Sequence, residues 1–196
     1  MARRNDHSPE QLRALTLTTV TAFLEQQPAA DLSLRQAAKL VGYSAGTLIN
    51  LFGSYSYLLL ALNGHTMDEM SGDLSAAMDQ ASTAKDKLRA MAEQYLAFAQ
   101  QHPHRWRLVF EHRLAEGETL PDWQQQRIDR LLALVEECML PLYPDASTTE
   151  IQLKIRTVWA SVHGIVHLTL EDKLFATPAI SGKALIDDLL TRYLPA

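Results

Sequence analysis

The chain has 196 residues, of which 47% are hydrophobic and 21% charged, so it is long and apolar enough for a sizeable core. This balance excludes a disordered chain, and no apolar run approaches the roughly 20 residues that a membrane-spanning helix needs. A single cysteine, Cys138, excludes an internal disulfide and a cysteine-based zinc cluster, and residues 1–10 lack the apolar stretch of a signal peptide. We therefore expect a cytoplasmic protein.

The net charge of −5 is unevenly distributed along the chain. Residues 1–53 hold five of the 18 basic residues and four of the 23 acidic ones. The rest of the chain carries a clear acidic excess. The N-terminal quarter is therefore the part that DNA phosphates would not repel.

The sequence predicts an all-α protein of about nine helices, because no strand-like alternation of apolar and polar residues is sustained. The first helix begins at Ser8, followed by proline and by a glutamine that completes a capping box. The second helix begins after Ser33 and stops at Gly42. The third runs from Ala45 to Phe52, and the fourth begins near Tyr55.

Five further amphipathic segments follow, of which four begin near Thr83, Pro103, Pro121 and Ser147. We expect the last two helices, near residues 147–171 and 180–194, to pair with their symmetry mates in a four-helix bundle. Residues 115–122 are expected to form the most mobile connection.

Small residues stand where the second and third helices must cross. A link of about three residues forces a steep crossing, as in a helix-turn-helix. Ala37 and Ala38 allow close contact there, and Gly42 can end the helix with a positive φ angle. Leu48 and Leu51 then face inward. An αα-turn in an ordinary bundle is the alternative for this spacing.

The outward side of the third helix is small, polar and free of acidic residues. Methyl groups of Ala45 and Thr47 can contact a thymine methyl, and Asn50 can pair with adenine. Ser44 can bond phosphate or base edges from the start of the helix. Arg35 is expected to contact a phosphate.

The segment LSLRQAAKLVGYSAGTLINLFGSYSYLL, from Leu32 to Leu59, resembles the DNA-binding segment of TetR-type transcriptional regulators (TetR/AcrR type). The matching positions, in register, are Arg35, Ala38, Gly42, Ser44, Gly46, Thr47, Leu48, Phe52, Ser54 and Leu58. The resemblance implies a helix-turn-helix domain at residues 1–54 and a helical ligand-binding and dimerisation domain at residues 55–196. It also implies a ligand-responsive repressor that binds a palindromic operator in double-stranded DNA as a homodimer. The DNA-binding residues that we expect are Ser33, Arg35, Tyr43, Ser44, Ala45, Gly46, Thr47, Asn50 and Tyr55.

Two positions depart from the family's usual pattern. Ile49 stands where a tyrosine is usual, and Tyr55 stands where a lysine is usual; both positions commonly contact operator phosphates in the family. We expect weaker non-specific DNA affinity, or compensation by Arg3 and Arg4. A protein of this fold that binds small molecules and has lost DNA binding is the alternative.

The C-terminal region resembles one branch of the family through QYLAFAQQHPHRWRLVF, from Gln94 to Phe110, and through the Trp-x-x-x-His-Gly signature at Trp159. The resemblance implies a pocket for a small apolar or amphipathic effector. The ligand-binding residues that we expect are Tyr95, Phe98, Trp106, Phe110, Trp123, Trp159 and His163. Plain core packing is the alternative for any one of them.

His163 and His167 lie four residues apart, as metal ligands on a helix would. No third ligand accompanies them, so we expect packing or hydrogen bonding and neither a metal nor another cofactor. Cys138 is expected to be a buried apolar residue and not a redox sensor. Enzyme motifs are absent: the sequence has no glycine-rich phosphate loop, no G-x-S-x-G and no paired carboxylates.

Overall fold

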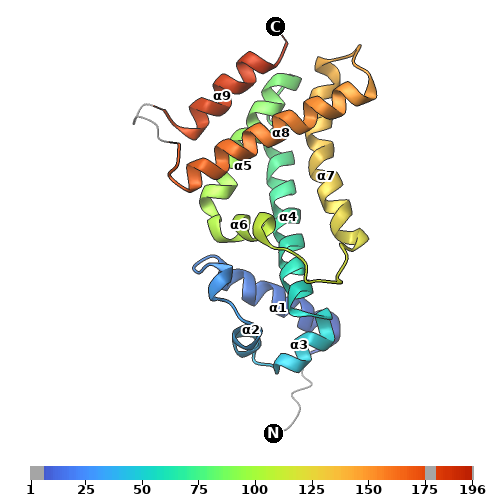
Figure 1. Cartoon of the computed structure of the whole chain (residues 1–196), viewed down its shortest axis with the longest axis vertical. Coiled ribbons are helices and arrows are strands. Elements are labelled where there is room, and N and C mark those ends of the chain that lie inside the picture. The colour runs from blue at the N-terminus through green and yellow to red at the C-terminus, as the bar shows by residue number, and fades with distance from the viewer. Residues whose placement is uncertain (1–6, 175–179, 196) are drawn as a thin grey trace. The chain divides into compact units, whose positions relative to one another are not determined.

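The computed structural model describes residues 7–174 and 180–195 of the chain. These residues form nine α-helices and two short 3-10 helices, with no strand among them, which confirms the all-α prediction. The α-helices are α1 (Pro9–Leu24), α2 (Leu34–Val41), α3 (Ala45–Phe52), α4 (Tyr55–Asp79), α5 (Ala84–Gln101), α6 (Pro103–Glu111), α7 (Asp122–Met139), α8 (Thr148–Leu170) and α9 (Gly182–Tyr193) (Figure 1). The 3-10 helices are η1 (Ala29–Asp31) and η2 (Leu140–Leu142).

Side-chain caps fix the helix starts that the sequence predicted. Ser8 and Gln11 form a capping box at α1, and Ser147 and Glu150 form another at α8. Thr83 accepts from the backbone N–H of Asp86 at the start of α5. These caps satisfy backbone groups that would otherwise lack partners, which is why the predicted starts agree with the structure.

The chain divides into two compact units. The first contains Met1–Asp68 and His102–Gln125, and the second contains Glu69–Gln101 and Gln126–Ala196. Helix α4 therefore contributes to both units. The functional boundary that we predicted at residue 54 falls inside the first unit and stays a prediction.

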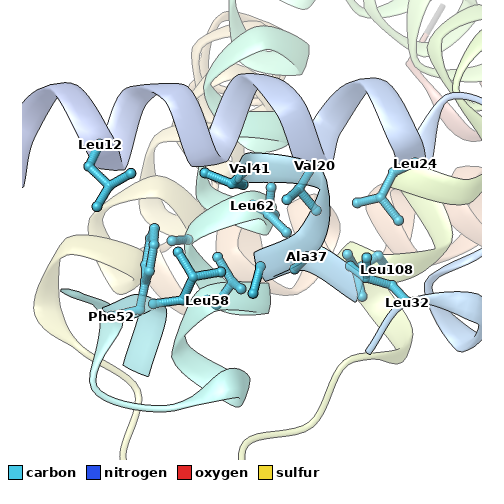
Figure 2. Packing of buried hydrophobic residues seen from close by; sticks show 13 residues of the cluster. Leu12, Val20, Leu24, Leu32, Ala37, Val41, Phe52, Leu58, Leu62 and Leu108 are labelled. Atoms are coloured by element: carbon cyan, nitrogen blue, oxygen red, sulfur yellow. The ribbon is translucent and has the colours of Figure 1, made fainter. Parts of the chain in front are cut away.

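The core of the first unit joins α1 to the helices around it. Figure 2 shows Leu12, Val20 and Leu24 of α1 on one side of this core. Opposite them lie Ala37, Val41, Phe52, Leu58, Leu62 and Leu108 from α2, α3, α4 and α6. Burying this apolar surface, at roughly 25 cal/mol per Å², fixes α2 and α3 against α1.

A buried cation ties the end of α1 to α6 within the first unit. Arg105 is 2% exposed, and its guanidinium lies 2.7 Å from a carboxylate oxygen of Glu25, the residue that caps α1. The other carboxylate oxygen of Glu25 lies 2.8 Å from Nδ1 of His102. Removing Glu25 would lower the stability of the fold, because the buried charge of Arg105 would lose its partner.

The α6–α7 connection, which we predicted to be mobile, is hydrogen-bonded to the start of α4. Ser54 donates to the Glu118 carboxylate, and the hydroxyl of Tyr57 donates to the carbonyl of Thr119. Ser56 lies 3.2 Å from Nε2 of His112. Burial lowers the pKa of His112 from its usual value, against an opposing effect of Glu118.

The second unit packs α5 against α8 and α9 (Figure 1). Ile155 of α8 and Ile186 and Leu190 of α9 are fully buried, as is Cys138 of α7. Among the described residues, no single helix has both the length and the apolar composition needed to cross a membrane. Helices α3 and α4 meet these two criteria only when they are taken together, as a pair bent by 65°.

Candidate functional site

The turn between α2 and α3 has the backbone geometry that the small residues predicted. Gly42 caps α2 with a φ of 82° and a ψ of 23°, in the left-handed region. Ala37 and Ala38 are buried, so α2 makes close contact with its neighbours there. A β-carbon at Gly42 would meet no atom within 4 Å, and the glycine is therefore required by its backbone angles and not by space.

Helix α3 starts at a side-chain cap and is anchored by its apolar side. The Ser44 hydroxyl accepts from the backbone N–H of Thr47 at 3.0 Å and also hydrogen-bonds the Thr47 hydroxyl at 2.8 Å. Leu48 and Phe52 are buried, and Leu51 packs against the same core. One side of α3 is thus fixed in the protein.

The other side of α3 carries the residues that we expected to read DNA. Ser44, Gly46 and Asn50 are exposed, while Ala45 and Thr47 are half-buried. Ser33 and Arg35, at the start of α2, are also exposed. The polar side chains of Ser33, Arg35, Ser44 and Asn50 are therefore accessible to solvent.

Two tyrosines of the predicted site have partners inside the protein. The hydroxyl of Tyr43 lies 2.8 Å from Nδ1 of His7, which the sequence did not single out. The hydroxyl of Tyr55 donates to the carbonyl of Leu32 at 2.6 Å. Burial raises the pKa of Tyr55. The proton that a phosphate contact would require from Tyr55 is thus already engaged. Arg3 and Arg4 lie outside the described residues.

The residues predicted to line one effector pocket are divided between the two compact units. Trp106, Phe110 and Trp123 belong to the first unit, and Tyr95, Phe98, Trp159 and His163 belong to the second. The rings of Trp106 and Phe110 lie 4.9 Å apart. Phe98 and Trp106 are fully buried. A single pocket that contains all seven stays a prediction.

His163 is held between aromatic neighbours on α8. Its Nδ1 lies 2.8 Å from the hydroxyl of Tyr95, and its ring stacks on Trp159 and on His167. Burial lowers the pKa of His163, and the nearby His167 lowers it further. Within residues 7–174 and 180–195, no group of three metal-ligating side chains occurs.

Cys138 is buried, and burial raises the pKa of its thiol to about 11. The thiolate, which is the reactive form, is therefore scarce near neutral pH. This environment agrees with the predicted apolar role.

Two buried amides, Asn63 on α4 and Gln124 on α7, were missed by sequence reasoning. Each has a side-chain oxygen for which the structure gives no hydrogen-bond partner. No motif marks them, because their neighbours are about 50 residues away in the sequence: Asn63 lies beside His112, and Gln124 lies beside Met67.

Several solved structures share this fold, and regulators are among them. A TetR family transcription regulator from Marinobacter aquaeolei VT8 is 17% identical, with a TM-score of 0.64 over 93% of this chain and 95% of that chain. A transcriptional regulator, FadR from Bacillus subtilis, in complex with stearoyl-CoA, is 13% identical, with a TM-score of 0.66 over 92% and 97%.

A protein of unknown function from Rhodococcus sp. RHA1 is 21% identical, with a TM-score of 0.76 over 98% of this chain and 97% of that chain. At these identities the likeness concerns the fold alone. A comparison with curated protein sequences gives no match.

The family described as "Tetracyclin repressor-like, C-terminal domain" matches the chain over residues 88–193. This match includes most of the second compact unit and the part of the first that contains α6. Because it covers more than half of the 196 residues, the chain belongs to the tetracycline-repressor-like family, whose members are regulators and not enzymes.

Proposed function

We propose that the protein is a cytoplasmic, ligand-responsive transcriptional repressor that binds a palindromic operator as a homodimer. Its DNA-binding residues would be Ser33, which caps α2, and those expected from the sequence on α2, on α3 and in the turn between them. Tyr55 contributes through its hydrogen bond to Leu32, which holds the start of α4 against the chain before α2. We also assign the chain to the branch with the Trp-x-x-x-His-Gly signature.

The observation that carries this proposal is the two-sided character of α3. Leu48 and Phe52 anchor one side, and the exposed Ser44, Gly46 and Asn50 occupy the other. The helix spans about 12 Å, which fits the width of a major groove. Its exposed N-terminus offers backbone N–H groups to phosphate.

The homodimer is supported by exposed apolar residues on α8. Leu153 is 67% exposed and Leu168 is 40% exposed. The two lie about four helical turns apart and so on the same side of α8, where exposed apolar residues support an interaction surface. A two-fold contact between copies of α8 and α9 would bury them and set two α3 helices about 34–36 Å apart.

An amphipathic effector is supported by the stearoyl-CoA bound to the structurally similar regulator from Bacillus subtilis. The effector would act by binding more tightly to the conformation of the dimer in which the distance between the two α3 helices does not fit the operator. If the bound effector lowers the affinity for the operator by a factor of about 150, the coupling free energy between the two sites is roughly 3 kcal/mol.

A mobility-shift titration against the DNA upstream of the protein's own gene tests the proposal. We expect retention that depends on sequence and weakens as salt rises, because released counterions drive phosphate binding. The matched control is a duplex of the same length and base composition in scrambled order. Equal retention of both duplexes would contradict the proposal.

The alternative is a small-molecule-binding protein of the same fold that has lost DNA binding. Ile49, which cannot donate a hydrogen bond, and the engaged hydroxyl of Tyr55 favour it. This alternative predicts no retention of either duplex at any salt concentration, while effector binding persists.

A further inference from the structure

The unpaired oxygens of Asn63 and Gln124 lie in the interior of the first compact unit. Asn63 is 2% exposed and Gln124 is 4% exposed. Within the described residues, Asn63 Oδ1 and Gln124 Oε1 have no hydrogen-bond donor. Buried polar atoms in native proteins are almost always paired, so each unpaired one indicates a water, an ion or a ligand.

Both amides lie along one side of α4. Gln124 Nε2 donates to the thioether sulfur of Met67 at 3.1 Å. Met67 follows Asn63 by four residues, so their side chains neighbour each other one helical turn apart, with β-carbons about 6 Å from each other. The two oxygens therefore belong to the same region of the interior.

The orientation of the amides does not remove this feature. If the Gln124 amide were turned over, its oxygen would face the Met67 sulfur, which carries no proton, and would still lack a donor. Turning Asn63 would let its oxygen face His112 Nδ1, now 3.4 Å from Nδ2, but its NH₂ group would then lose that partner. Only the present orientation of Gln124 pairs a donor, Nε2–H, with the sulfur acceptor, so Oε1 is the atom that is left without a donor.

Thr66, about one turn beyond Asn63 on α4, and its partner Arg105 form hydrogen bonds to other groups. The Thr66 hydroxyl donates to the carbonyl of Leu62 at 3.1 Å. The guanidinium of Arg105 bonds that hydroxyl through Nε at 3.4 Å and pairs with Glu25 through Nη1. The described chain thus gives neither oxygen a donor, and a water or a ligand can supply one. Met67 is unbranched and can change rotamer to admit it.

We propose that Asn63, Met67 and Gln124 form the polar end of the effector site, and that the effector is a small amphipathic molecule with N–H or O–H donors. An ammonium, amide or hydroxyl group meets this requirement. A carboxylate does not, because it is an acceptor only and would be desolvated beside the carbonyl oxygen of Gln124. The inference rests on the proposed function for its regulatory meaning, while binding itself is measurable without DNA.

Thermal unfolding of the full-length protein with three probes of equal chain length tests the site: n-octylamine, 1-octanol and octanoate. We expect a rise in Tm with octylamine and with octanol, and none with octanoate at the same concentration. Isothermal titration calorimetry with octylamine should show saturable binding to one site per chain.

The decisive variant is Gln124→Leu, which removes the unpaired oxygen. Its Tm without probe should equal or exceed that of the wild type, because a buried atom without a partner is lost. The rise with octylamine should disappear. The matched control, Gln126→Leu, changes an exposed glutamine on the same helix and should respond to octylamine as the wild type does.

Three results would overturn the inference: no rise with any probe, an equal rise with octanoate, or an undiminished octylamine response in Gln124→Leu. The first would mean that water satisfies the two oxygens. If octylamine binding depends on Gln124 while operator retention fails, the site stands and the proposed DNA-binding function falls.

Discussion

At the scale of single residues, substitutions of Asn50 and Arg35 should distinguish recognition of the bases from attraction to the phosphates. Both are exposed, on α3 and α2 respectively. Asn50→Ala should cost about 1–3 kcal/mol of operator affinity and relax the sequence preference. Arg35→Ala should weaken binding to all duplexes alike and reduce the salt slope by about one unit.

Fluorescence anisotropy titrations of operator and scrambled duplexes over a salt series measure both effects. The molecular weight of each variant in solution should equal that of the wild type, because neither residue lies on α8 or α9. Unchanged binding of both variants would show that this surface does not read DNA.

Cys138 gives a second prediction at this scale. With the pKa of its thiol raised to about 11, the reactive thiolate appears only in strongly alkaline solution. The folded protein should therefore resist iodoacetamide at neutral pH and react once denatured in guanidinium chloride. Mass spectrometry of the intact chain measures the added group. Rapid labelling of the folded protein would contradict the buried position of this residue.

The α2–α3 turn can be tested as an element through Gly42. An alanine there must adopt the left-handed backbone at a φ of 82°, which costs roughly 1–2 kcal/mol. The same change at Gly72, inside α4 with no atom within 4 Å of the new β-carbon, should stabilise the protein by roughly 0.5–1 kcal/mol. Denaturant unfolding compares the two variants. A stabilising Gly42→Ala would refute the proposed turn geometry.

The contact between α1 and α6 predicts a dependence of stability on pH. Burial tends to raise the pKa of Glu25, but hydrogen bonds and charge from His102 and Arg105 outweigh it and lower this pKa. A lowered folded-state pKa adds stability above the unfolded value near pH 4.5, and this stability is lost as pH falls through the folded value.

Glu25→Gln should therefore cost about 2 kcal/mol at neutral pH, the scale of a hydrogen bond to a charged group. It should also flatten the acid side of the stability curve. Glu116→Gln, on the exposed connection before α7, serves as the control. Equal acid sensitivity of Glu25→Gln and the wild type, measured by urea unfolding at several pH values, would contradict this role.

Local signals explain why some elements could be predicted from the sequence and others could not. The bounds of α3 follow from a serine cap and from the periodicity of Leu48 and Phe52, all within one short segment. The pairing of Arg105 with Glu25 joins residues 80 positions apart, and no local pattern encodes it. The same holds for Gln124 and Met67, and so the candidate effector residues emerged only from the folded chain.

The predicted aromatic pocket stays a prediction. The family resemblance put Trp106 and Trp159 into one set, and the two belong to different compact units. Aromatic residues are used both in cores and in ligand sites, so their type alone does not distinguish the two uses.

At the scale of the whole molecule, a substitution of Leu153 tests whether the protein forms the proposed dimer. Replacing this exposed residue of α8 with glutamate should abolish the dimer, because an apolar two-fold contact would then bury two unpaired charges. Analytical ultracentrifugation should show a monomer with a wild-type circular dichroism spectrum. Leu120→Glu, on the exposed α6–α7 connection, should remain dimeric. A dimeric Leu153→Glu protein would exclude this part of α8 from the interface.

The most direct measurement is selection of bound duplexes from a random DNA library by the full-length protein, followed by footprinting of the selected sequence. Two half-sites related by a two-fold axis should emerge, with centres about one helical turn, 34–36 Å, or a multiple of it apart. Asn50→Ala should lose the enrichment. Failure of the wild type to enrich any sequence would contradict the assignment of α3 as the element that reads DNA.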